Sequence, residues 1–523
     1  MKKTNYFHRF CALALSCLLL VSLFPVMQAF ADGDGAIHIK SAEDLQELAR
    51  SCTLDSWSRG KTVVLDNDIV LESDDALPIP TFGGTFRGNG YTISGLSITQ
   101  SVSPAGLFGV LQKDAVIKNL NVEGTVTPSG DSENIGGIVG ENHGTIESCT
   151  FNGSVSGKRS VGGIAGSNLA TGIVRACDAS GAIFGQSMTG GIVGENLGSI
   201  VSCRGRAYVN IESTDPSIDL SNMNLEFSLD LAKLSRADTL NTATDTGGIA
   251  GRSSGMILTS VNTGTIGYEH VGYNVGGIVG RTDGLISGCV NQGRVLGRKD
   301  VGGIAGQADS ATIEACANYA TVTGTSRNVG GIVGRLNGKS AARSTVLRCA
   351  NFGTISNGTN NFSAGIVGTA YYTTLSECYN VGSATGNRVG GILGQTDSNT
   401  TVTSCYNAGA ITLAAAGNYN YAGSLSGYND GGSVSNCYYL TGTQAIGSGS
   451  GDTTALTEEQ LKSFDTVLKL GGAFVNDAKN QNSGYPVLAW QDADAKLIVA
   501  FSVNMTGASV HVYDAQNGEQ TPE

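Results

Sequence analysis

The chain has 523 residues, of which 75 are glycine, and it carries a formal net charge of −12 with only 15% charged residues. Glycine does not recur at every third position, which excludes a collagen-like chain. The acidic balance argues against nucleic acid or an anionic membrane surface as a partner. Excess glycine beside 40% hydrophobic residues indicates many tight turns between short strands.

Residues 1–31 have the pattern of a secretory signal peptide. Basic residues at the start precede an apolar run, 11–26, and the residues from Ala29 to Ala31 match an A-x-A cleavage pattern. We therefore expect cleavage near Ala31 and a secreted or cell-surface location, with an uncleaved anchor as the alternative. No later segment is long and apolar enough to predict a transmembrane helix.

Residues 32–99 are expected to form an N-terminal cap and the first turns of the fold. Ser41 and Asp44 have the spacing of a helix capping box, and Leu45, Leu48 and Ala49 would share one apolar face. A cap is expected because the open end of a repetitive β fold exposes unpaired strand edges and an apolar interior.

Residues 100–440 contain eleven copies of a repeat that begins with a glycine doublet or a variant of it. Each copy holds short β-favouring runs separated by Gly, Asn, Asp or Ser, has no room for two helices and lacks the leucine-rich repeat pattern. The fold class predicted is all-β: a parallel β-helix solenoid with three short strands per turn, stacked about 4.8 Å apart, and small helical caps at both ends. The copies begin at Gly106, Gly136, Gly162, Gly190, Gly247, Gly276, Gly302, Gly330, Ala364, Gly390 and Ala422.

Nine of the ten cysteines after Ala31 occupy one position of this repeat. Leu120 and Ser260 fill the same position in other copies, and leucine can neither bind a metal nor act as a nucleophile. No C-x-x-C pair is present, and equivalent side chains of neighbouring turns would be too far apart for a disulfide. We predict a row of reduced, inward-facing thiols at Cys149, Cys177, Cys203, Cys289, Cys316, Cys349, Cys378, Cys405 and Cys437.

A second row, of asparagines, lies two residues beyond the cysteine position. Asparagines stacked in register can form hydrogen bonds along the rod axis, and asparagine tolerates the left-handed backbone of turns. A calcium-binding row is the alternative, but the carboxylates that calcium prefers are missing. The row comprises Asn262, Asn291, Asn318, Asn351, Asn380 and Asn407.

Two breaks in the repeat are candidate partner-binding regions, because specific recognition needs a local departure from a flat, repetitive surface. One is the insertion 212–245, which contains Phe227; we expect the rod to fold without it. The other is a tyrosine-rich region. Its candidate residues are Tyr371, Tyr372, Tyr419 and Tyr421.

Residues 441–491 are expected to form a C-terminal cap, and 492–523 a tail or the start of a β-sandwich-like segment. Thr457 and Gln460 have capping-box spacing, and Gly471 would terminate the helix. Leu461, Phe464 and Leu468 are predicted to line one side of it. Trp57 and Trp490 fall in the two cap regions, where we expect them to plug the rod ends.

Gly-Leu-Phe-Gly at 106–109 and Gly-Ile-Val-Gly at 137–140 resemble the GLUG motif. That repeat occurs in secreted and surface proteins of bacteria, notably gut Firmicutes. The lead-in IHIKSAEDLQELA and the exit GYPVLAW at 484–490 are also similar to this family, so the resemblance covers about 36–491. It implies a right-handed parallel β-helix and little about activity.

The sequence contains no recognisable catalytic constellation. GLUG repeats also accompany bacterial immunoglobulin A metalloproteases, but the His-Glu-x-x-His zinc motif is absent, as are G-x-S-x-G and P-loop motifs. Glu141 with His143, and the Arg298-Lys299-Asp300 cluster, are interpreted as solvated surface. We predict no catalytic residues, metal or cofactor.

The predicted function is therefore a secreted or cell-surface scaffold without catalytic activity, which is adhesive or binds a ligand. Its partner would be a glycan or protein on a host or bacterial surface. The alternatives are a polysaccharide lyase or hydrolase, or a glycan-binding module, on the same fold.

Overall fold

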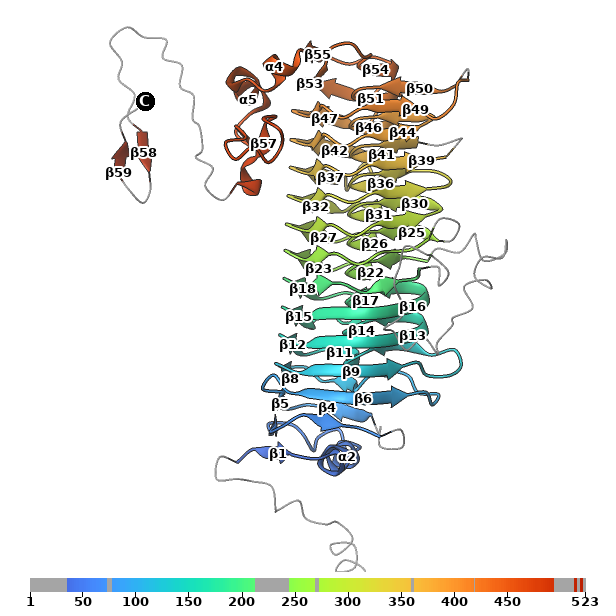
Figure 1. Cartoon of the computed structure of the whole chain (residues 1–523), viewed down its shortest axis with the longest axis vertical. Coiled ribbons are helices and arrows are strands. Elements are labelled where there is room, and N and C mark those ends of the chain that lie inside the picture. Colours follow the sequence, from blue (N-terminus) through green and yellow to red (C-terminus); the bar gives the residue numbers. More distant parts are fainter. Residues whose placement is uncertain are drawn as a thin grey trace, which may run out of the picture.

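The computed structural model describes residues 35–72, 78–211, 244–268, 272–358, 362–417, 419–492, 512–514 and 518–520. The signal segment 1–31, Phe227 and nearly all of the insertion lie outside this part of the chain. Figure 1 shows that the described residues form a rod of stacked turns of chain, which we call rungs. The predicted all-β parallel β-helix is confirmed.

Three long parallel sheets run along the rod. Sheet A has 14 strands, from β1 (Ile37–Ile39) to β52 (Ser433–Ser435). Sheet C has 13 strands, from β4 (Ile79–Phe82) to β54 (Ile446–Ser448). Sheet B has 23 strands because most rungs contribute two to it, and a five-stranded sheet begins at β29 (Val295–Gly297) and ends at β49 (Ile411–Leu413). Sheet A has more strands than the repeat has copies, because the lead-in segment adds rungs of its own.

One rung illustrates the path of the chain. Isoleucines and a cysteine, Ile278, Ile286 and Cys289, point inward and are fully buried. The sequence predicted three strands per turn, whereas this rung has five, because the glycine doublet and the asparagine turn each separate two strands. The five are β25 (Tyr273–Gly276), β26 (Val279–Thr282), β27 (Leu285–Ser287), β28 (Val290–Asn291) and β29, and β30 (Lys299–Gly302) begins the next rung.

Steric crowding explains the glycines of the repeat. A Cβ atom at Gly277 would lie 2.3 Å from Cγ of Asn291, so the second glycine of the doublet makes room for the asparagine row. A Cβ atom at Gly280 would lie 2.4 Å from the carbonyl carbon of Asp245 in the rung below. Both contacts are with atoms that cannot move away, so a larger residue is excluded at each position.

The cysteines form the inward row that the sequence predicted. All ten cysteines of the described residues are buried and none is in a disulfide, and Leu120 and Ser260 are fully buried at the same position. Burial raises the pKa of Cys177, Cys316 and Cys405 well above the ordinary thiol value. The row is therefore part of the hydrophobic core.

The asparagines form the predicted ladder. The Nδ2 atom of each donates to Oδ1 of the asparagine in the next rung, at 2.7–2.8 Å from Asn262 through to Asn407. Each also closes its own turn: Asn351, for example, donates to Gly353 O and accepts from Gly353 N. The side-chain amides of these buried residues are thus satisfied by neighbouring rungs and by the turn.

A shorter polar ladder, which the sequence did not predict, lies at the corner between sheets C and A. Asn142 donates to Asn168 at 2.7 Å, Asn168 to Asn196 at 2.8 Å, and Asn196 to Ser253 Oγ at 2.9 Å. These asparagines stand two residues after the last glycine of the motif. Thr282 and Ala308 hold the position in later copies, so the pattern is too brief to be evident in the sequence.

A short helix, α2 (Ala42–Ser51), closes the N-terminal end of the rod (Figure 1). The capping box between Ser41 and Asp44 is present, and Leu45, Leu48 and Ala49 are buried against the core, as predicted. Trp57 is partly buried against the same core, with Lys61 Nζ 4.3 Å from the centre of its ring.

The C-terminal helices differ from their predicted form. Thr457 and Gln460 make the capping box of α4 (Glu458–Leu461), and Gly471, at φ 103°, ends α5 (Phe464–Leu470), as expected. Phe464 and Leu468, however, are 45% and 40% exposed. The single apolar side predicted for them is wrong, because Ser463 starts a second helix and turns Val467 and Leu470 toward the protein instead.

The segment 458–491 packs on the flank of the rod, beside sheet B, rather than over its end (Figure 1). Outward tyrosines of successive rungs, Tyr379, Tyr406 and Tyr438, lie beneath it. Tyr379 donates to Gln491 Oε1 at 2.8 Å, and Trp490 Nε1 donates to Arg348 O at 3.0 Å. Trp490 therefore does not plug the rod end.

The segment also includes the pair β56 (Phe474–Val475) and β57 (Val487–Leu488), and the 3-10 helix η1 (Ala489–Gln491).

Beyond this segment the structure describes an antiparallel pair, β58 (Val512–Asp514) and β59 (Gly518–Gln520). None of the described helices has the length and apolar composition required to cross a bilayer.

Candidate functional site

The interior of the described rod is lined by apolar side chains and cysteines. Cysteines are the most numerous reactive side chains there, yet no group of three or more His, Cys, Asp or Glu is arranged to hold a metal ion in the described part of the chain.

One outer corner, between sheets B and C, has a regular structure along most of the rod. We call the residue two places before the first glycine of each doublet the corner residue. From Asn134 to Asn328 the corner residues have positive φ, 45° at Asp245 and 62° at Asn274, for example. Asn274 donates to Asp245 Oδ1 at 2.6 Å, and Asn328 donates to Asp300 Oδ1 at 2.5 Å.

The corner carboxylates are buried. Asp245 and Asp300 are 5% and 3% exposed, and burial raises the pKa of both. The interpretation of Arg298-Lys299-Asp300 as solvated is therefore wrong for Asp300, because the left-handed turn directs its carboxylate against Asn328. Asp245, placed within the insertion by the sequence, belongs to the rod.

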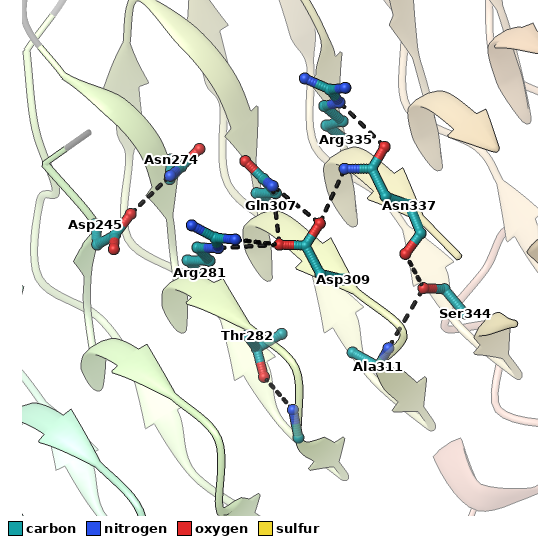
Figure 2. Close-up of polar contacts among 11 residues, drawn as sticks. Asp245, Asn274, Arg281, Thr282, Gln307, Asp309, Ala311, Arg335, Asn337 and Ser344 are labelled. Atoms are coloured by element: carbon teal, nitrogen blue, oxygen red, sulfur yellow. Dashed lines mark hydrogen bonds and ion pairs between the residues drawn. The ribbon is translucent and has the colours of Figure 1, made fainter. Parts of the chain in front are cut away.

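Figure 2 shows a polar network on sheet C beside this corner, centred on Asp309. Arg281 Nη2 lies 2.8 Å from Asp309 Oδ2, and Gln307 and Asn337 donate to the same carboxylate at 2.9 Å. Burial by itself raises the pKa of Asp309, but these hydrogen bonds and the Arg281 guanidinium outweigh it, so the pKa is lowered. A carboxylate held ionised in this way is unsuited to be a general acid, and we interpret the network as structural.

The corner changes in three consecutive rungs near the C-terminal end. Phe362, Arg388 and Tyr421 occupy the corner position there, in register with one another. They lie in the strands β40 (Phe362–Ala364), β45 (Arg388–Gly390) and β50 (Tyr421–Gly423), without the positive φ of the corner residues below. Large half-buried side chains thus replace the buried Asp245, Asn274, Asp300 and Asn328 of the four preceding rungs.

These side chains form a cluster that we call the aromatic patch: Phe362, Arg388, Tyr421 and Tyr428. The rings of Tyr421 and Tyr428 stack with centres 5.8 Å apart. The guanidinium carbon of Arg388 lies 5.1 Å from the centre of the Phe362 ring and 5.3 Å from that of Tyr428. Such distances allow a cation–π interaction with each ring.

Two polar contacts position the arginine of the aromatic patch. Arg388 Nη1 donates to Gln395 Oε1, and its Nε donates to Tyr419 O, both at 3.3 Å. Tyr419 itself is 73% exposed and stands beside the patch. The arrangement exposes aromatic rings and a guanidinium together, which suits a ligand with both apolar and acceptor groups.

The structure separates the four tyrosines proposed from the sequence. Tyr419 and Tyr421 lie at the aromatic patch. Tyr371 ends β41 (Val367–Tyr371) and Tyr372 follows it with φ 51°. Both are half-buried and lie at the opposite end of the sheet C strand from the corner, toward sheet A. Phe227 lies outside the described residues.

Sequence reasoning missed Phe362, Arg388 and Tyr428. A signal was present, because the corner position changes from Asn or Asp to aromatic or arginine in these copies. The sequence alignment also began the last copy at Ala422, whereas in the structure Gly423 pairs with Gly390. The corner residue of the last copy is therefore Tyr421.

The fold and the surface thus define a parallel β-solenoid that carries an aromatic patch on one corner. Residues 131–156 match the family model described as the GLUG motif. A segment of 94 residues, 18% of this chain, is 39% identical to halomucin of Haloquadratum walsbyi (strain DSM 16790 / HBSQ001). The match spans only 1% of halomucin.

Two solved structures are also similar. A proposed immunoglobulin A1 protease from Bacteroides ovatus is 15% identical, with a TM-score of 0.25 over 88% of this chain and 96% of that one. The A-module of the mannuronan C-5 epimerase AlgE6 from Azotobacter vinelandii is 14% identical, with a TM-score of 0.34 over 77% and 97%. Similarity at this level says nothing about shared activity.

Proposed function

We propose that this chain is a scaffold of the cell exterior, without catalytic activity, that binds a carbohydrate at its aromatic patch. The observation that carries the proposal is the replacement of a buried polar corner by Phe362, Arg388 and Tyr421 in three consecutive rungs. The corner residues of the four preceding rungs are all Asp or Asn and all buried.

The chemistry of the patch favours a glycan. The C–H faces of a sugar ring are apolar and weakly positive, so they pack on the negative faces of tyrosine and phenylalanine rings. Arg388 presents donors beside those rings for hydroxyl or carboxylate oxygens. The signal-peptide pattern at 1–31 and the similarity to part of halomucin support an exterior location.

A glycan array probed with the chain beginning at Asp32 tests the proposal, with each spot read for both binding and cleavage. The variants are Arg388→Ala and the double variant Tyr421→Ala with Tyr428→Ala, which we expect to lose at least about tenfold in affinity. Tyr273→Ala is a matched control, because Tyr273 also contacts cationic side chains, Arg298 and Lys299, beside a corner of ordinary structure. It should bind fully.

Full binding by both patch variants would contradict the proposal. Tyr371→Ala and replacement of 212–243 by a short linker would then show whether one of the other regions suggested by the sequence carries the site. Release of oligosaccharides on the array would favour the alternative function, a polysaccharide-active enzyme.

A further inference from the structure

The turns of three consecutive rungs and a loop of the N-terminal cap line an open depression of about 490 Å³, which we call the cavity. The turns join sheet C to sheet A, at Gly83, at Gln112 to Asp114, and at His143. The cap loop contributes Arg59. This place is far along the rod from the aromatic patch and on a different corner, so nothing that follows rests on the proposed function.

Hydrogen bonds hold the walls of the cavity in place. Arg59 Nε donates to Gln112 Oε1 at 2.9 Å, and Gln112 Nε2 donates to Asp55 O at 3.1 Å. Ser58 Oγ accepts from Gly83 N at 2.9 Å. The cap loop is thus tied to two rungs, and the Arg59 and Gln112 side chains are held together in the wall of the cavity.

The histidine of the cavity is also oriented. His143 Nε2 lies 2.7 Å from Glu141 Oε1, and since a carboxylate only accepts, Nε2 carries a proton and donates to it. The His143 carbonyl accepts from Thr171 Oγ1 at 2.8 Å, which holds the turn. Glu141 and His143 are expected from the sequence to be solvated surface residues. In the structure they contact each other, and His143 lines the cavity.

Two cationic side chains, Arg59 and Lys113, line the cavity against one lining carboxylate, Asp114, while His143 is paired with Glu141. A local excess of basic groups on a chain of net charge −12 indicates an anionic ligand. The volume falls in the range of small-molecule sites and far exceeds that of a simple inorganic anion. Gln112 and Val110 add a polar and an apolar wall, which suit hydroxyls and a C–H face.

We propose that this cavity binds a sugar that carries a carboxylate or a sulfate group. Arg59 and Lys113 attract the anionic group, and Gln112 and Val110 contact the ring. Asp114 opposes the negative charge of the ligand.

Isothermal titration calorimetry tests the proposal. The chain beginning at Asp32 is titrated with galacturonate, glucose 6-sulfate, glucose and sodium sulfate. We expect one or both acidic sugars to bind, more weakly as NaCl is raised, and glucose and sodium sulfate to bind at least about tenfold more weakly. The stronger of the two acidic sugars identifies the anionic group. Equal binding of glucose would overturn the proposal, as would equal binding of sodium sulfate.

Variants assign the binding to the cavity. Arg59→Ala and Lys113→Ala should each weaken the binding of the acidic sugar at least about fivefold. Asp114→Asn should strengthen it, and asparagine tolerates the φ of 68° at this position. Gly83→Ala leaves every charge in place but brings a Cβ atom within 2.5 Å of Gln112 Oε1 and 2.9 Å of Arg59 Cγ, so it should displace both side chains and weaken binding.

Lys158→Ala is the control, because Lys158 is an exposed cation paired with Asp131 away from the cavity. It should bind the acidic sugar as tightly as the unmodified chain. Unchanged affinity in Arg59→Ala and Lys113→Ala, with thermal unfolding showing that both variants are folded, would place the anion elsewhere and refute the assignment.

Discussion

Gly280 lies directly against the backbone of Asp245 in the rung below, with room for a hydrogen but not for a methyl group. A Cβ atom built on Gly280 is 2.4 Å from the carbonyl carbon of Asp245 and 2.4 Å from the nitrogen of Thr246. The third glycine of the motif therefore allows the two rungs to approach closely at this corner.

Gly280→Ala should destabilise the rod by about 3 kcal/mol or more, because backbone atoms of the neighbouring rung cannot move aside. The measurement is the midpoint of thermal unfolding together with soluble yield. Gly358→Ala is the matched control, since its nearest neighbour would be Thr325 O at 3.9 Å, and it should change little. Equal behaviour of the two variants would contradict the steric explanation.

Asn351→Ala should cost about 2–3 kcal/mol of unfolding free energy. The substitution removes the ladder hydrogen bonds to Asn318 and Asn380 and both hydrogen bonds to Gly353 in the turn. Urea unfolding monitored by circular dichroism measures the loss. Thr345→Ala, on an outward position of sheet A, should stay within about 0.5 kcal/mol; a comparable loss there would argue against a special role for the ladder.

The ten cysteines of the described residues should resist thiol reagents in the native protein and react after denaturation without a reductant. Burial raises the pKa of Cys177 and Cys316, and that of Cys52 to about 11, so little thiolate is present at neutral pH. Thiol titration with a chromogenic disulfide before and after guanidinium treatment gives the two counts. Thiols that remain hidden after denaturation would reveal disulfides.

Asp300→Asn should stabilise the rod at neutral pH by about 1–2 kcal/mol. Folding raises the pKa of Asp300, so the protonated carboxyl group stabilises the folded state. This stabilisation is complete below the ordinary aspartate pKa and is lost as the pH rises through the pKa that Asp300 has in the folded protein. Asparagine removes this buried charge and can supply a donor to Asn274 Oδ1, a buried atom without a partner that faces Asp300 in the ladder.

Thermal unfolding of Asp300→Asn and of the unmodified chain, compared from pH 4 to pH 8, measures this effect. The advantage of the variant should shrink toward the acid end. Asp283→Asn, at an exposed aspartate, is the control and should show no such trend. A variant less stable than the unmodified chain at pH 7 would show that the Asp300 carboxylate is favourable.

Alkaline pH should release the C-terminal segment 458–491 from the flank. Burial raises the pKa of Tyr379 and Tyr406 well above the ordinary tyrosine value. Their contribution to docking is therefore complete below about pH 10 and is lost as pH rises through the higher folded values. Fluorescence of Trp490, which contacts the rod through Arg348 O, reports the release.

The double variant Tyr379→Phe with Tyr406→Phe cannot ionise, so its docked segment should tolerate higher pH, although it loses the hydrogen bonds to Gln491 and Pro486. Tyr419→Phe, at an exposed tyrosine, should behave as the unmodified chain. Identical alkaline transitions in all three proteins would exclude tyrosine ionisation as the cause.

The sequence alone determined the solenoid and its interior rows. Successive copies stack in register, so each residue of a copy meets its own counterpart in the next rung, and the neighbours of Cys289 or Asn291 can be read from the alignment of copies. The helix capping boxes at Ser41 and Thr457 were also predictable, because each pairs a residue with another only three positions along the chain. Periodicity and short range made these features predictable.

Only the tertiary structure decided the features that depart from the repeat. Tyr379 meets Gln491 across 112 residues, and Arg59 of the cap meets Gln112 across 53. The aromatic patch arises where Phe362, Arg388 and Tyr421 lose the left-handed corner that their counterparts keep. The first two contacts join residues without a common period, so their partners depend on how the whole chain packs. The patch residues share one repeat position, but the loss of the left-handed backbone there is a property of the folded rungs.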